Sequence, residues 1–108
     1  MKTILCIDAR RSDLQSLAAI VEHAGYRVLA AGSTGQALRI FSSNHVDGVL
    51  LRRRSCSEWE VQEVQQHLRR VAPEVPLLLF DGPAEVTQSA LPWMESYMET
   101  GNLVTTNA

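Results

Sequence analysis

The chain of 108 residues lacks the features that mark several large classes of protein. Lys and Arg number 10 against 12 Asp and Glu, so the basic excess typical of nucleic-acid or anionic-membrane binding is missing. The apolar runs are the length of strands and far shorter than a membrane span, and the N-terminus has no signal-peptide pattern. We therefore expect a cytoplasmic protein that binds neither nucleic acid nor membrane.

Groups for covalent or metal chemistry are also scarce. The two cysteines, Cys6 in an apolar run and Cys56 in a polar segment, provide neither a disulfide framework nor a four-ligand metal site. The three histidines are not spaced with Cys or acidic residues as metal ligands. No nucleophile-base pair and no Gly-rich phosphate loop is found, so we expect no enzyme, no catalytic residue and no metal site.

What the chain does have is a series of short apolar runs. Continuous runs of this kind indicate strands buried on both faces, and their alternation with helical patterns predicts a parallel sheet. Acids close the first and the fourth run, and three arginines, Arg52, Arg53 and Arg54, follow the third. The carboxyl ends of such strands are where an open α/β sheet usually binds its ligand. The four runs cover residues 3–8, 26–31, 46–51 and 75–81.

Helix signals lie between these runs. Ser12-Asp13-Leu14-Gln15 and Ser57-Glu58-Trp59-Glu60 both have the form of a capping box, and Gly25 is suited to end the first helix. The pattern is weaker after residue 83: we expect a short helix over residues 84–91 that breaks at Pro92, and a fifth, edge strand over residues 93–98.

The layout is that of one α/β domain over residues 1–108, with a core over 1–101 and a tail over 102–108. The sheet is predicted to be parallel and doubly wound. The tail is polar and shows no amphipathic pattern, so the final helix is expected to be missing. One flank of the sheet would then be left bare unless a partner or a longer parent chain covers it.

Four stretches of the chain resemble the receiver domain of two-component response regulators. They are Ile4-Leu5-Cys6-Ile7-Asp8 and residues 24–31, 46–51 and 72–79, and the similarity extends from Lys2 to about Gly101. The resemblance implies a flavodoxin-like fold with the strand order 2-1-3-4-5.

Members of that family become phosphorylated on their own aspartate at the end of the third strand. An acidic pair after the first strand holds Mg²⁺, and a Ser or Thr after the fourth strand contacts the phosphoryl group. By that resemblance Asp8 matches the first acid, but Ala9 replaces the second, Arg52 stands at the acceptor aspartate and Asp81 stands at the hydroxyl position. The chain therefore resembles a pseudo-receiver without a phospho-acceptor.

The family's remaining positions also differ. Thr100 is expected at the position of a conserved family lysine, and Tyr97 matches the family's common switch aromatic. With one carboxylate lost and an arginine between the others, we expect no cofactor, and Mg²⁺ binding is disfavoured.

Two interpretations of Arg52 are open. In one, its guanidinium replaces the metal or the lysine by pairing with Asp8 and Asp81, and holds the crevice in one state. In the other, the site has decayed and Arg52 points to water.

The expected function is a signalling module, not phosphorylated, that acts through a protein partner in a cytoplasmic signalling pathway. The alternative is a domain that binds a small anion or nucleotide with the Arg52–Arg54 loop. The oligomeric state is not specified by the sequence.

Overall fold

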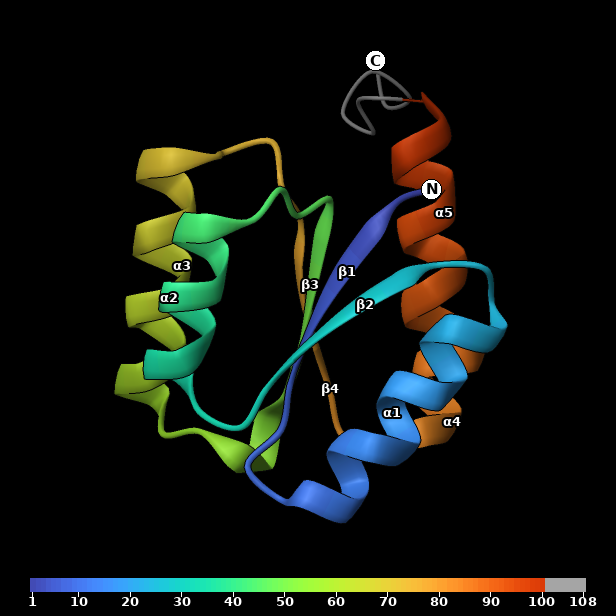
Figure 1. The fold of residues 1–108 in the computed structure, drawn as a ribbon, viewed down its shortest axis with the longest axis horizontal. Helices are drawn as coiled ribbons and strands as arrows, with labels where there is room; N and C mark the ends of the chain where they lie inside the picture. The colour runs from blue at the N-terminus through green and yellow to red at the C-terminus, as the bar shows by residue number, and fades with distance from the viewer. Residues whose placement is uncertain (101–108) are drawn as a thin grey trace.

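A four-stranded parallel sheet lies between two layers of helices in the computed structural model, which describes residues 1–100 (Figure 1). The strand order is β2-β1-β3-β4, which confirms the parallel sheet and its first four positions. The expected fifth strand is absent from the part of the chain that the structure describes. The strands are β1 Thr3–Ile7, β2 Arg27–Ala31, β3 Gly48–Arg52 and β4 Leu77–Phe80.

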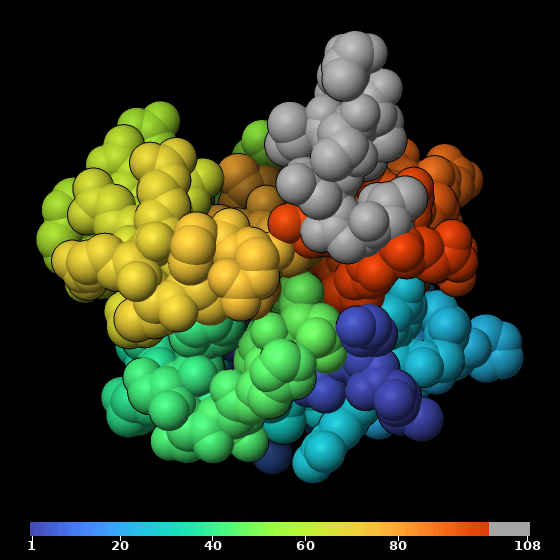
Figure 2. Space-filling model, turned by 90° about the horizontal axis from the view of Figure 1, so that it is seen from above, coloured from blue at the N-terminus to red at the C-terminus, as the bar shows by residue number. Residues whose placement is uncertain are grey.

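The helices divide between the two faces of the sheet. Two of them, α2 (Thr34–Ser43) and α3 (Glu58–Val71), cover one face, and α1 (Arg11–His23) covers the other together with the last helical segment (Figure 1). Seen from above in Figure 2, the N-terminus (blue) lies beside the segment before β3 (green), with the end of α3 (yellow) on the left and α5 (red) on the right. No helix within residues 1–100 is long and apolar enough to cross a membrane.

Each strand contributes side chains to two separate cores. On β1, Ile4 and Cys6 pack toward α1 and α5, whereas Leu5 and Ile7 pack toward α2 and α3. The same parity holds along β3 and β4, because neighbouring strands are paired even with even and odd with odd. A residue's parity in a strand therefore decides which helices it can reach.

The capping predictions have different outcomes. Ser57 and Glu60 form the predicted capping box at the start of α3, with hydrogen bonds of 3.1 and 2.9 Å. The predicted box at Ser12 is wrong: α1 begins at Arg11, and its N-cap, Arg10, makes no side-chain cap. Gly25 follows α1 with a φ of 99°, as expected for a left-handed helix stop.

The predicted break at Pro92 and the predicted strand over residues 93–98 are both wrong. Pro92 cannot donate a hydrogen bond and its ring crowds the carbonyl four residues earlier, but it is the second residue of α5 and a wide π-helical turn precedes it. The chain remains helical because this turn accommodates the ring. Three consecutive elements make up the segment: α4 Pro83–Glu85, the π-helical turn η2 Val86–Ala90, and α5 Leu91–Thr100.

This last helical segment covers the face of the sheet that was expected to be bare. Met94 of α5 is fully buried, and a Cβ on Gly48 would lie 2.6 Å from its sulfur, so Gly48 allows the helix to approach β3 closely. The helix that covers this face is formed by residues that were expected to be an edge strand, and the final helix that was expected to be missing would follow them, outside the described residues. The predicted tail, residues 102–108, lies outside the described residues.

Asp47 ties the segment before β3 to the start of β1. One carboxylate oxygen accepts a hydrogen bond from the Thr3 backbone N–H at 2.8 Å, and the other lies 2.9 Å from His45 Nε2. Burial by itself raises the pKa of Asp47, but the Thr3 and His45 hydrogen bonds outweigh burial and lower that pKa overall.

Replacement of Met94 by Ala tests the packing of α5. We expect a loss of about 3 kcal/mol in the free energy of unfolding, because the change leaves a cavity beneath α5. Urea denaturation followed by circular dichroism measures this loss. Glu99→Ala, on the exposed side of the same helix, serves as the control and should change stability by about 0.5 kcal/mol or less. Equal effects of the two changes would contradict the packing of Met94 on the sheet.

Asp47→Asn tests the hydrogen bonds at the start of β1. Since the folded-state pKa of Asp47 is lowered, its carboxylate stabilises the fold above the unfolded-state pKa, and this contribution is lost as the pH falls through the folded-state pKa. At pH 7 we expect the variant to be less stable by about 1 kcal/mol. The difference should shrink steadily below about pH 4 in denaturation curves measured over pH. A difference independent of pH would contradict this role.

Candidate functional site

The candidate site lies at the carboxyl ends of β1 and β3. A hollow of about 270 Å³ is formed there by the loop after β1, the first turn of α1 and the 3-10 turn η1, which covers Arg53–Ser55. Parallel strands end together at this edge, so residues 44 or more positions apart in the chain meet.

Asp8 is the most deeply buried charged group of the site, with 1% of its surface exposed. Its Oδ1 accepts hydrogen bonds from the Arg10 backbone N–H and the Ser55 hydroxyl, each at 3.1 Å. Its Oδ2 lies 3.3 Å from Arg52 Nη1. Both carboxylate oxygens are therefore engaged, as a buried charge requires.

Arg52 lies between two carboxylates. Its Nη1 lies 3.3 Å from Asp8 Oδ2 and 3.5 Å from Asp13 Oδ2, and its side chain is 23% exposed. One nitrogen serves both carboxylates, so the contacts do not have the parallel geometry of a bidentate pair. The guanidinium nevertheless joins the end of β3 to the end of β1 and the first turn of α1.

The predicted contact between Arg52 and Asp81 is not formed. Asp81 Oδ1 instead lies 3.3 Å from Arg53 Nε, in a pair whose two side chains are about half exposed. Strand parity explains the difference: Asp8 and Arg52 continue the even positions, which face α1, whereas Arg53 and Asp81 continue the odd positions. Arg53 thus has a partner, and Asp81 is not part of the hollow.

Two residues of the site were missed from the sequence. Asp13 is reached because it lies in the first turn of the helix that covers the even face. Ser55 accepts a hydrogen bond from the Ala9 N–H at 3.1 Å while its own hydroxyl donates to Asp8. Asp13 could have been found from the sequence, because Arg52 is at an even position of its strand and therefore faces α1, whose first turn contains Asp13. The 3-10 turn that brings Ser55 back over β1 has no comparable sequence pattern.

Two further predicted site residues lie elsewhere or are undescribed. Tyr97 is in α5, where its hydroxyl donates to the Glu74 carbonyl at 2.6 Å and its ring stacks on Trp93. Glu74 precedes β4, so Tyr97 lies toward the amino ends of the strands, whereas Arg52 lies at the carboxyl end of β3. Thr100 ends α5, and its side chain lies outside the described part of the structure.

The surroundings of both cysteines keep them in the thiol form. Burial raises the pKa of the Cys56 thiol, and the nearby Glu60 and Asp8 raise it further, so the thiol is protonated at neutral pH. Burial also raises the pKa of Cys6, to about 12. Within residues 1–100, no group of three His, Cys, Asp or Glu side chains is placed to hold a metal ion.

Comparison with known proteins gives matches at the level of structure. No protein-family model matches the chain, and no curated protein matches its sequence. Among solved structures, a response regulator receiver domain protein from Clostridium thermocellum superposes with a TM-score of 0.66 at 24% identity, over 88% of this chain and 76% of the other.

Two further structures are similar to the same degree. A CheY-like receiver domain protein from Methanospirillum hungatei has a TM-score of 0.67 at 21% identity, over 95% of this chain and 78% of the other. A response regulator protein from Thermotoga maritima, solved in complex with Mg²⁺ and BeF, has a TM-score of 0.66 at 22% identity, over 87% and 81%. The chain therefore shares the flavodoxin-like fold of receiver domains, with four strands in the described residues.

Proposed function

We propose that this chain is a receiver-like signalling domain that is not phosphorylated and acts by binding a protein partner. The contact of Arg52 with the buried Asp8 carries the proposal. A guanidinium stays protonated at physiological pH and cannot accept a phosphoryl group, and here it stands at the end of β3.

The proposal includes the absence of a Mg²⁺ site and of enzyme activity. Mg²⁺ requires oxygen ligands in near-octahedral geometry, whereas both oxygens of Asp8 already accept hydrogen bonds from protein groups. A cation in the hollow would lie beside the Arg52 guanidinium, and the two like charges would repel each other. The second acidic position is occupied by Ala9, whose backbone N–H is bonded to Ser55.

Arg52 supports a single arrangement of the hollow at the carboxyl ends of β1 and β3. Its contacts join β3, β1 and α1, and Ser55 joins the following turn to Asp8 and Ala9. All of these contacts are made between groups of the protein, and the domain would thereby offer a fixed surface to a partner. The exposed indole of Trp59, at the start of α3, is a suitable contact residue near this edge because exposed aromatics often dominate protein interfaces.

The ion pairs weigh against the anion-binding alternative. Arg52 contacts Asp8 and Asp13, and Arg53 contacts Asp81, so two of the three arginines already face carboxylates. Arg54 lines the hollow and forms no ion pair among the residues described. Arg10 also lines the hollow and lies 3.7 Å from Asp13. Of the arginines at the hollow, Arg54 alone is left without a carboxylate partner among the described residues, which gives little attraction for an anion at an exposed site.

Incubation with acetyl phosphate and Mg²⁺ tests the central proposal. Intact-protein mass spectrometry should show no acid-labile phosphate adduct, because no free carboxylate is presented beside a bound metal. A phosphorylatable receiver domain treated in parallel is the positive control. A stable adduct on this protein, lost on Asp8→Asn or Asp13→Asn, would overturn the proposal.

Arg52→Ala tests whether the arginine holds the crevice together. We expect the free energy of unfolding to fall by about 2 kcal/mol, because the buried Asp8 loses its cationic partner while keeping the Ser55 and Arg10 hydrogen bonds. Hydrogen exchange of the Ala9 and Ser55 amides should become faster. Arg53→Ala, which removes an exposed pair, is the matched control and should cost about 0.5 kcal/mol or less. Unchanged stability and exchange in Arg52→Ala would show that the pair is incidental.

A further inference from the structure

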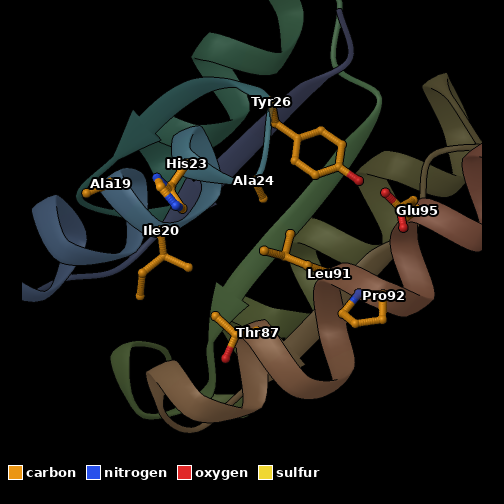
Figure 3. Close-up of a pocket in the computed structure, with 9 residues that line it drawn as sticks. All are labelled: Ala19, Ile20, His23, Ala24, Tyr26, Thr87, Leu91, Pro92 and Glu95. Carbon is orange, nitrogen blue, oxygen red and sulfur yellow. The ribbon is translucent and has the colours of Figure 1, made fainter.

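A second hollow, separate from the Arg52 site, lies between α1 and the last helical segment. Its volume is about 680 Å³, and Figure 3 shows side chains from the two sides facing one another across it. Its apolar walls come from both helices, and they are formed by Ala19, Ile20 and Ala24 on one side and Leu91 and Pro92 on the other.

Local sequence explains why this space stays open. The wall from α1 is built partly of the short side chains of Ala19 and Ala24, which leave room where longer side chains would meet the opposite helix. The opposite wall includes Pro92, which follows the wide π-helical turn. Each helix is held by its own contacts with the sheet, through Leu17 on α1 and Met94 on α5, so the gap between them does not need to close.

One end of the hollow is acidic. The Tyr26 hydroxyl points toward the Glu95 carboxylate (Figure 3), and Glu99 is also near. Burial raises the pKa of Tyr26 most, and the negative charges of Glu95 and Glu99 raise it further, so the phenol is neutral and remains a hydrogen-bond donor. The carboxyl end of α1, at His23, adds the negative pole of a helix dipole at the same end.

An adjoining hollow of about 380 Å³ continues this acidic end. It shares Ala24, Tyr26 and Glu95 with the first hollow and adds Glu99 and one cation, Lys2. Two carboxylates against one ammonium make the junction of the hollows negative. The acidic groups therefore gather at one end, whereas Thr87, whose hydroxyl donates to the Ala84 carbonyl, lies toward the other (Figure 3).

We propose that the hollow between α1 and α5 binds a small organic cation, with an apolar ring between the helices and an ammonium group at Glu95. Its volume falls within the range of about 300–1,000 Å³ that is usual for small-molecule sites, and its lining is mostly apolar with a few polar groups. The carboxylates select charge: an ammonium group is attracted by Glu95 and Glu99, and a carboxylate in the same place is repelled. The site uses neither Arg52 nor Asp8, so it stands independently of the proposed function.

Titration of the ¹⁵N-labelled protein with 1-naphthylmethylamine tests the site. We expect saturable amide shifts confined to residues 19–26 and 87–95, with a Kd on the order of 1 mM, as suits a fragment of this size. 1-Naphthylmethanol should bind more weakly, and 1-naphthylacetate weaker by about tenfold or more, because the Glu95 end repels it. Equal binding of amine and acetate, or shifts spread over other parts of the protein, would overturn the proposal.

Two variants sharpen the test. Glu95→Gln should weaken binding of the amine about fivefold and leave that of the alcohol unchanged, because it removes charge without changing shape. Ala19→Phe, at an exposed position of α1, should fill the hollow and abolish binding of both probes. Glu63→Gln, which removes the same charge from α3, is the matched control and should change nothing. An unchanged affinity of the amine in Glu95→Gln would exclude the assigned role of Glu95.

Discussion

Burial of the parallel sheet on both faces is the constraint on which the rest of the structure depends. Because side chains alternate across each strand, every strand must satisfy two different cores, one under α1 and α5 and one under α2 and α3. The alternation continues past the strand ends into the polar residues that follow. Asp8 and Arg52 therefore meet on the face of α1, while Arg53 and Asp81 meet on the other. The ion pairs at the carboxyl edge are consequences of the same pleat that builds the cores.

The last helical segment shows how strongly that constraint acts. A face of the sheet without a helix would leave Leu50 and Phe80 in contact with water, and α5 buries them by bringing Met94 over Gly48. The tolerance of Pro92 in this helix follows from its place in the first turn and from the π-helical turn ahead of it. The same segment leaves a gap beside α1, although side chains of both helices belong to one core against the sheet.

At the carboxyl ends of β1 and β3, one buried carboxylate and one guanidinium form an ion pair. The pair does not have ideal geometry, and its contribution to stability comes from burial. Asp8 has almost no access to water, so the loss of any of its partners would leave a buried charge poorly compensated. The exposed pair of Arg53 with Asp81 has similar geometry and much less importance. The two ion pairs therefore differ in how deeply they are buried, although the distance between their charged atoms is 3.3 Å in both.

Much of the fold could be predicted from the sequence. Strands buried on both faces have continuous apolar sequences, and the capping box at Ser57, which begins α3, is a local sequence motif. The position of Arg52 at the end of an apolar run could also be predicted from the sequence, and the structure places it at the end of β3. Tertiary structure decided the partners of Arg52, the return of Ser55 over Asp8, and the helical state of residues 91–100. In that segment Leu91, Met94 and Met98 recur at helical spacing, but Pro92 and the aromatic residues favoured a strand when read locally. Local patterns determine which segments become strands and where many helices begin, whereas a contact between residues 44 positions apart, such as Arg52 with Asp8, depends on which face each residue takes once the strands are paired.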